Sequence, residues 1–187
     1  MKSDKTDITL AQRLRQFMLR HQAGWQPTIS TAESCTSGRI AATITSIDGA
    51  SRYYQGGIVA YQDEIKVQEL CVSQDSIIRH GVVSTAVARQ MAVGCLKRFH
   101  TDYAIATTGY TGAGNDQVPS GTVCIGFACL TPACRTGRDR QVCNDQDTVS
   151  STAIHINLTQ GTREEKTAAA AQAAISRFLE WAGHNAE

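Results

Sequence analysis

The chain has 187 residues, of which 42% are hydrophobic and 19% charged, and its formal net charge is +1 at pH 7. This length and composition suffice for one domain with a sizeable core. The lysines and arginines are scattered and form no basic tract interleaved with aromatic residues, which argues against a nucleic-acid-binding surface. No apolar run approaches the roughly 20 residues of a membrane-spanning helix, and the amino terminus lacks the apolar core of a secretory signal. We therefore expect a cytoplasmic protein.

The seven cysteines form no recognisable framework, because their odd number argues against a closed set of disulfides. The cysteines to consider as zinc ligands are Cys124, Cys129, Cys134 and Cys143. They contain no Cys-x-x-Cys pair, and Cys124 and Cys129 fall on a predicted strand, where residues five apart point to opposite faces. We expect no bound metal.

A helix, a strand and a tight turn open the chain. Apolar residues at helical spacing predict a helix over residues 8–21, and the apolar run 27–32 predicts a strand. The turn Glu33-Ser34-Cys35-Thr36-Ser37-Gly38 follows, and then a helix over residues 38–46. A serine in such a turn lies beside the free N–H groups of the first helical turn, which suits attack on a carbonyl and stabilisation of the oxyanion. Ser34 is a candidate nucleophile, although capping of the helix alone is the commoner role for such a residue.

The next strand, which ends near Tyr61, and the helix over residues 65–70 supply a candidate base. Serine is not nucleophilic at neutral pH without a base, and none of the five histidines lies in a recognisable triad motif. A lysine can serve when burial or nearby positive charge lowers its pKa from about 10.4 towards neutrality. Lys66 is therefore the candidate base, and the phenol of Tyr61 could relay a proton. The simpler alternatives are a solvated lysine and an aromatic packed on the core.

A long helix is predicted over residues 85–99, and the strand 103–107 opens into the loop Thr108-Gly109-Tyr110-Thr111-Gly112-Ala113-Gly114-Asn115. Glycines allow backbone N–H groups to approach a phosphate. The loop lacks both the Gly-Lys-Ser/Thr ending of a P-loop and the Rossmann glycine spacing, so neither a nucleoside triphosphate nor a dinucleotide is indicated. A plain connection to the next strand, over residues 122–130, is the alternative.

The last third of the chain predicts a long hairpin and a closing helix. Strands over residues 122–130 and 153–158 flank a polar stretch from Thr131 to Ser151, which is typical of a surface loop or a flexible flap. The alanine-rich helix 163–181 begins at Arg163, which could bind a phosphate, although an arginine near a helix end is usually solvated. This order of elements predicts a three-layer α/β/α sandwich around a mixed, mostly parallel sheet, with the ligand at the strand ends.

Taken together, these segments resemble the CinA carboxy-terminal domain family, whose enzymatic members are nicotinamide-nucleotide amidohydrolases, also called NMN deamidases. The resemblance covers the chain from about residue 10 to residue 181. Its strings are Ala32-Glu33-Ser34-Cys35-Thr36, Gly56-Gly57-Ile58-Val59-Ala60-Tyr61 with Lys66, His80-Gly81-Val82-Val83-Ser84, Ala88-Arg89-Gln90-Met91-Ala92, Thr108-Gly109 with Gly112, and Pro119-Ser120-Gly121-Thr122-Val123. It implies one domain over residues 1–187, with a flexible loop at 131–151.

The resemblance also implies an activity, namely hydrolysis of the carboxamide of nicotinamide mononucleotide to nicotinate mononucleotide and ammonia, by a Ser-Lys mechanism without a cofactor. Ser34 matches the nucleophile, Lys66 the general base and Tyr61 a site tyrosine. The matching substrate-binding positions are Thr36, Ser37, Gly38, Thr108, Gly109, Gly112 and Arg163, the last for the phosphate. As partners we expect the nucleotide substrate and further copies of the chain in a homo-oligomer, but neither nucleic acid nor a membrane.

The chain departs from the family pattern in two motifs. The pattern ends the first motif in two glycines, and its loop runs Gly-Ile-Ala-Gly-Pro-Gly before a Lys-Pro pair. The residues found here instead are Ser37 in the first motif, Tyr110, Thr111 and Ala113 in the loop, and Val118-Pro119 in place of Lys-Pro. Two other interpretations therefore stay open: a serine amidohydrolase of altered substrate specificity, and a non-enzymatic paralogue that binds a nucleotide or a protein partner.

Overall fold

A five-stranded sheet forms the centre of the molecule in a computed structural model, which describes residues 8–20, 26–131 and 149–184. The strands, in the spatial order β2-β1-β3-β4-β5, are β1 (Ile29–Glu33), β2 (Tyr54–Val59), β3 (Tyr103–Gly109), β4 (Thr122–Leu130) and β5 (Val149–Asn157). β1 pairs in parallel with β2 and β3, whereas the β3–β4 and β4–β5 pairs are antiparallel. The mixed sheet and the long hairpin are confirmed. Among the strands described, β4 points in the opposite direction to the other four, so the sheet is mostly parallel by strand direction. Counted by neighbouring pairs, two of the four pairs are parallel.

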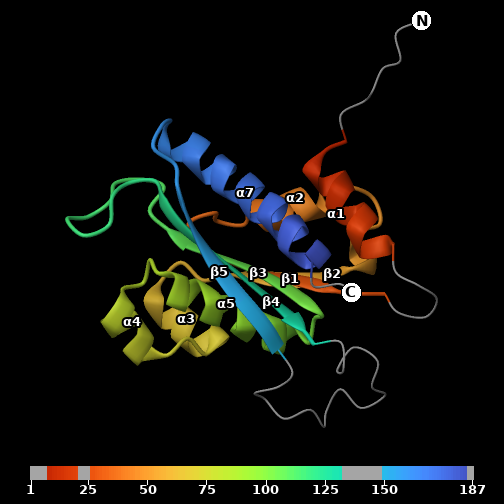
Figure 1. Cartoon of the computed structure of the whole chain (residues 1–187), viewed down its shortest axis with the longest axis horizontal. Helices are drawn as coiled ribbons and strands as arrows, with labels where there is room; N and C mark the ends of the chain where they lie inside the picture. Colours follow the sequence, from red (N-terminus) through yellow and green to blue (C-terminus); the bar gives the residue numbers. More distant parts are fainter. Residues whose placement is uncertain (1–7, 21–25, 132–148, 185–187) are drawn as a thin grey trace, which may run out of the picture.

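Helices cover both faces of this sheet (Figure 1). They are α1 (Leu10–Leu19), α2 (Arg39–Thr45), α3 (Asp63–Leu70), α4 (Gln74–His80), α5 (Thr85–Phe99) and α7 (Arg163–His184), with a short 3-10 helix, η1 (Ala50–Arg52). α1, α2 and α7 bury one core, in which Tyr103 packs edge-to-face on Phe178 with the ring centroids 5.5 Å apart. The helices α3, α4 and α5 cover the opposite face, where a second core contains Met91 and Leu96 of α5. None of the described helices is both long enough and apolar enough to cross a membrane.

Most predicted element positions are confirmed, and the bounds of α5 and β4 agree with the sequence pattern. Helix α4 escaped prediction because none of its residues is buried and no apolar stripe marks it. The expected loop from Thr131 to Ser151 is wrong at its end, since β5 already begins at Val149. The rest of that stretch, residues 132–148, lies outside the described residues.

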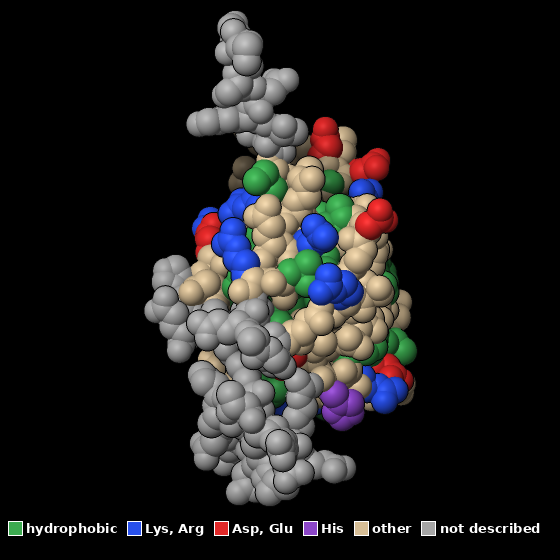
Figure 2. All heavy atoms as spheres, turned by 90° about the vertical axis from the view of Figure 1, so that its right-hand side faces the viewer, with side chains coloured by type: hydrophobic (Ala, Val, Ile, Leu, Met, Phe, Trp, Pro, Cys, Tyr) green, Lys and Arg blue, Asp and Glu red, His purple; other side chains and the backbone are tan. Residues whose placement is uncertain are grey.

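The described surface carries mixed charge on the face shown in Figure 2. Lysine and arginine side chains lie there among acidic, hydrophobic and uncharged ones. Ion pairs between exposed side chains occur both between elements, as for Arg39 with Glu164 at 3.2 Å, and within one helix, as for Arg79 with Asp75 at 3.5 Å. Such solvent-exposed pairs contribute little to stability, so the two cores hold the fold.

Helix α5 approaches β4 closely at Gly126. A Cβ atom built on this glycine would lie 2.1 Å from the carbonyl oxygen of Ala88. Only a residue without a side chain therefore allows the helix backbone to lie so near the strand. The contact fixes the helical layer on the face of the sheet that carries α3.

We expect Gly126→Val to lower the free energy of unfolding by about 2–3 kcal/mol, because an extra side chain would push α5 away from the sheet. Urea denaturation followed by circular dichroism measures this difference. The matched control is Gly183→Ala in α7, where a built Cβ meets no atom within 4 Å. Since alanine is the better helix former, this control should be neutral or slightly stabilising. A Gly126→Val protein as stable as the wild type would show that the close approach does not exist.

Candidate active site

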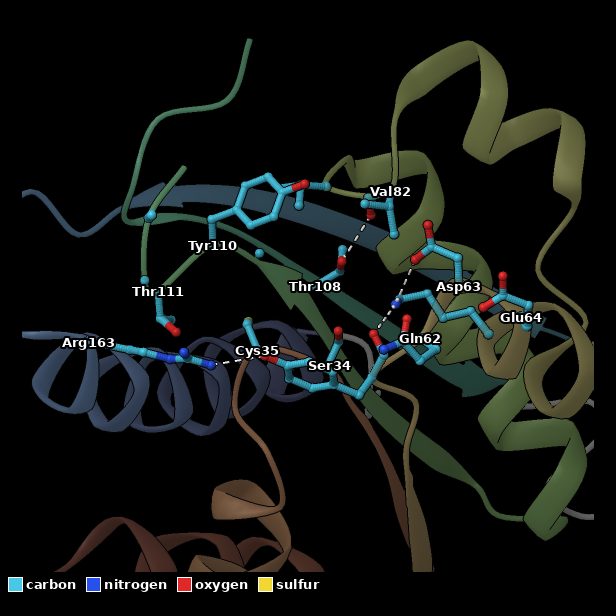
Figure 3. Close-up of a pocket in the computed structure, with 16 residues that line it drawn as sticks. Ser34, Cys35, Gln62, Asp63, Glu64, Val82, Thr108, Tyr110, Thr111 and Arg163 are labelled. Atoms are coloured by element: carbon cyan, nitrogen blue, oxygen red, sulfur yellow. Dashed lines mark hydrogen bonds and ion pairs between the residues drawn. The ribbon is translucent and has the colours of Figure 1, made fainter. Parts of the chain in front are cut away.

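A cavity of about 490 Å³ opens where the carboxyl ends of β1, β2 and β3 meet. Its lining comes from the turn after β1, residues 61–64 and 66 after β2, residues 82–83 before α5, the end of β3 with the loop after it, and the first residue of α7 (Figure 3). Ligands of open α/β sheets bind at this edge, beyond the carboxyl ends of parallel strands. The cavity is therefore the candidate site.

The cavity brings together most of the residues that the sequence singled out. Those that line it are Ser34, Tyr61, Lys66, Thr108, Gly109, Gly112 and Arg163. Thr36, Ser37 and Gly38 are not part of the lining. Thr36 is buried with its hydroxyl hydrogen-bonded to that of Thr107 at 2.7 Å, Ser37 is exposed, and Gly38 is the N-cap of α2. These three residues shape the turn, and their side chains do not contact the cavity.

Glu33 holds the turn that carries Ser34. Its carboxylate, in a residue only 1% exposed, accepts hydrogen bonds from the N–H groups of Ile40 at 3.0 Å and Ala41 at 2.8 Å. Such charge-assisted bonds cap α2, whose N-cap residue makes no side-chain cap of its own. The expectation that the first turn of α2 offers free N–H groups to an oxyanion is wrong for these two groups, because Glu33 occupies them.

Other N–H groups lie closer to Ser34 along the chain. The N–H of Ser37 donates to the carbonyl of Ser34 at 3.2 Å, while those of Cys35 and Thr36 have no backbone acceptor among the described residues. Ser37 (φ 52°) and Gly38 (φ 89°) have left-handed backbone conformations, which bend the chain sharply into α2. The N–H groups of Cys35 and Thr36 are therefore the candidate oxyanion donors that lie nearest to the serine in sequence.

Cys35 lines the same cavity but is a poor alternative nucleophile. Burial raises the pKa of its thiol to about 12, and the nearby Glu33 carboxylate adds to this shift. The thiol therefore stays protonated at neutral pH, whereas the thiolate is the reactive form. Ser34 is left as the nucleophile candidate in the turn.

Lys66 is buried at 1% exposure, so the solvated-lysine alternative is wrong. Its Nζ donates hydrogen bonds to the carbonyl oxygen of Tyr61 at 3.1 Å and to Oδ1 of Asp63 at 3.2 Å. Among the described residues, no hydrogen bond joins Lys66 Nζ to Ser34 Oγ, although both residues line the cavity.

Tyr61 and Arg163 meet at the mouth of the cavity. The Tyr61 hydroxyl accepts a hydrogen bond from Nη2 of Arg163 at 2.9 Å, and Tyr61 is 53% exposed rather than packed in the core. A Cβ on Gly112 would lie 3.3 Å from Cδ of Arg163, so the glycine lets the loop after β3 approach the arginine. In Figure 3 Arg163 lies on one side of the pocket and Asp63 on the other, with Ser34 between them. The site thus has a guanidinium on one side and the Asp63–Lys66 ion pair on the other.

Sequence reasoning missed two residues of the site region, Glu33 and Asp63. Glu33 directly precedes the nucleophile candidate, and Asp63 stands three residues before Lys66 in the same helix, a spacing at which helical side chains meet. The second spacing was visible in the sequence and could have indicated the ion pair. As for metals, the described residues contain no group of three or more His, Cys, Asp or Glu side chains arranged to hold an ion. Cys134 and Cys143 lie outside the described residues.

Sequence comparison finds relatives that are longer than this chain. A CinA-like protein of Flavobacterium psychrophilum is 52% identical over 103 residues, which are 54% of this chain and 25% of that protein. A CinA-like protein of Chlorobium chlorochromatii is 40% identical over 124 residues, covering 65% of this chain and 28% of that protein. The chain thus spans about a quarter of the length of these relatives.

Structure comparison finds relatives of similar size. The competence damage-inducible protein A of Klebsiella pneumoniae has a TM-score of 0.76 and 27% identity, over 94% of this chain and 96% of that one. A competence-damaged protein (CinA) superfamily protein of Escherichia coli has a TM-score of 0.73 and 28% identity, over 97% and 93%. A profile of the CinA C-terminal domain matches residues 11–180. The chain therefore belongs to the CinA C-terminal domain family.

Proposed function

We propose that the protein is a serine amidohydrolase that converts nicotinamide mononucleotide and water to nicotinate mononucleotide and ammonia. The observation that carries this proposal is the shared cavity, into which Ser34 and the buried Lys66 project at the meeting point of three strand ends. Membership of the CinA C-terminal domain family supports it, since enzymatic members of that family are nicotinamide-nucleotide amidohydrolases. Neither a metal nor a cofactor enters the proposed reaction.

In the first step, the uncharged amine of Lys66 takes the proton of the Ser34 hydroxyl while Oγ bonds to the carboxamide carbon. The N–H groups of Cys35 and Thr36 hold the negative charge that develops on the amide oxygen. The ammonium of Lys66 then returns the proton to the amide nitrogen, the C–N bond breaks and ammonia leaves. Ser34 is left as an ester of the nicotinate group.

In the second step, Lys66 takes a proton from a water molecule, whose oxygen attacks the ester carbon. The bond to Ser34 Oγ breaks, Oγ regains the proton from Lys66, and nicotinate mononucleotide is released. For Tyr61 we add a second role to the proton relay that the sequence suggested. Because its hydroxyl accepts from Arg163, we propose that it orients the guanidinium.

Arg163 is the proposed phosphate ligand, because a guanidinium can donate two parallel hydrogen bonds to phosphate oxygens. It begins α7, and the glycine loop lies against it. Thr108 and Gly109 line the space between this arginine and Lys66. The mononucleotide would therefore lie with its phosphate at Arg163 and its carboxamide at Ser34.

The test is ammonia release from nicotinamide mononucleotide by the wild type, compared with release from nicotinamide riboside, which lacks the phosphate. Arg163→Gln is expected to raise KM for the mononucleotide about 10- to 100-fold, the effect of losing one charge-assisted contact. Its KM for the riboside should stay near the wild-type value. A folded wild-type protein that releases no ammonia from the mononucleotide would contradict the proposal.

One observation favours a second candidate, the same Ser-Lys chemistry on a different amide. Tyr110 lines the cavity, and hydrogen bonds of its backbone with Thr122 and Gly121 fix its position. A bulky ring held there restricts the shape of the substrate. A panel of carboxamides scored by ammonia release separates the two candidates, whereas calorimetric binding of the mononucleotide without turnover would indicate a binding protein.

A further inference from the structure

We propose that Asp63 is a positioning residue for the base: it directs Lys66 Nζ towards Ser34, and its charge sets the pH at which Lys66 can accept a proton. The inference rests on the proposed function and adds to it a residue whose role the family resemblance does not imply. Asp63 lines the cavity from the first turn of α3. Its side chain is 47% exposed, while that of Lys66 is 2% exposed.

The hydrogen bonds of Lys66 Nζ determine which way its lone pair can point. An uncharged lysine amine has two N–H groups and one lone pair. Two acceptors are in place, the Tyr61 carbonyl at 3.1 Å and Asp63 Oδ1 at 3.2 Å. When both N–H groups are donated to them, the lone pair is left as the one site on Nζ that can take a proton from Ser34. Asp63 therefore orients the base through its contact with Nζ.

The negative charge of Asp63 also acts on the protonation of Lys66. A carboxylate within hydrogen-bond distance stabilises the ammonium form, which cannot act as a base. Lys66 is therefore converted to its active form at a higher pH than it would be beside an uncharged acceptor of the same shape. An asparagine keeps such an acceptor and removes the charge, so the two effects of Asp63 can be separated.

Other ionisable groups share the cavity with Lys66. Glu64 of α3 lines the cavity, as do four ionisable groups outside α3, namely Cys35, Tyr61, Tyr110 and Arg163. Among the described residues, none of the charged groups of α5, which packs against α3, lines the cavity. Arg98 of that helix pairs with Glu69 instead, at 3.4 Å. Asp63 is the described carboxylate that makes an ion pair with Lys66.

The experiment compares the pH dependence of kcat/KM for ammonia release from nicotinamide mononucleotide in three proteins. Asp63→Asn is expected to move the acidic limb of the profile to lower pH by about one unit and to keep kcat close to the wild-type value at high pH. Asp63→Ala also removes the charge but leaves one N–H group without its acceptor. Its kcat should fall about tenfold or more at every pH, because the amine is no longer held in place.

Two controls test whether the effect belongs to Asp63. Asp75→Asn removes a carboxylate from the first turn of α4, where Asp75 pairs with Arg79 in solvent. Its profile should coincide with that of the wild type. Glu64→Gln removes the neighbouring carboxylate of the cavity, and a shift as large as that of Asp63→Asn would overturn the proposal. So would an unshifted Asp63→Asn profile, or identical behaviour of the asparagine and alanine variants.

A measurement without substrate keeps this proposal separate from the proposed function. In protein labelled with carbon-13 lysine, the Lys66 Cε signal can be assigned by its loss in Lys66→Arg. We expect this signal to titrate at lower pH in Asp63→Asn than in the wild type. An unchanged titration overturns the role of the charge. A shifted titration in a protein that releases no ammonia from nicotinamide mononucleotide would instead refute the proposed substrate and leave the pairing of Asp63 with Lys66 intact.

Discussion

Ser34→Ala is expected to lower kcat for ammonia release from nicotinamide mononucleotide by at least about 10³-fold, because neither of the other two hydroxyl residues of the turn, Thr36 and Ser37, lines the cavity. The thiol of Cys35 cannot replace it at neutral pH, since burial raises its pKa to about 12. The small hydroxyl contributes little to ground-state binding, so KM should change much less than kcat. Steady-state kinetics with an ammonia assay measures both constants.

Lys66→Met should give a loss of similar size, about 10²- to 10⁴-fold in kcat, because a general base is removed. Methionine fills the buried space without a charge, and the Asp63 carboxylate that loses its partner is 47% exposed, so water can solvate it. The loss can therefore be assigned to chemistry if thermal unfolding is unchanged.

Ser46→Ala is the matched control for the serine, since Ser46 is the C-cap of α2 and lies outside the cavity. It should retain wild-type kinetics. If Ser34→Ala turned over at the wild-type rate in the same assay, the Ser-Lys mechanism would be wrong, whatever the substrate.

The parts of the fold that were predictable from sequence are those marked by a long regular pattern. The stripe of Val87, Met91, Cys95 and Leu96 predicted α5, because these residues recur on one helical face and pack into one core. The apolar run of β4 likewise predicted a buried strand. Helix α4 shows no such stripe. None of its residues is buried, so its sequence needs no apolar face. Periodicity thus reports the core and not every helix.

The candidate site was predictable to the extent that it lies at strand ends. Ser34, Tyr61 and Thr108 follow or end three neighbouring parallel strands, and the topology alone brings such positions together. The two bonds from Glu33 to Ile40 and Ala41 could not be predicted, because they depend on the bend of the turn at Ser37 and Gly38. Likewise, the sequence indicated that Lys66 could be a base but not which groups its Nζ would contact. Hydrogen-bond partners are set by three-dimensional geometry, which residue spacing describes only within a helix.

A large loss of stability is expected when Glu33, which caps α2 from the end of β1, is replaced. Removing its carboxylate leaves the buried N–H of Ile40 and the partly buried N–H of Ala41 without their acceptor. An unsatisfied buried donor costs about 1–3 kcal/mol, so Glu33→Ala should lower the free energy of unfolding by about 2–4 kcal/mol. Urea denaturation measures the loss.

Glu33→Gln should be intermediate in stability, because its amide has one oxygen to accept a hydrogen bond while its NH₂ group faces a second donor. Glu164→Gln is the matched control: Glu164 is exposed on α7 and pairs with Arg39 in solvent, so its loss should be small. The same substitutions at Glu33 should also lower kcat, since the turn that carries Ser34 loses its anchor on α2. Glu33→Ala with wild-type stability would show that α2 does not need this cap, and that the Ser34 turn is held in another way.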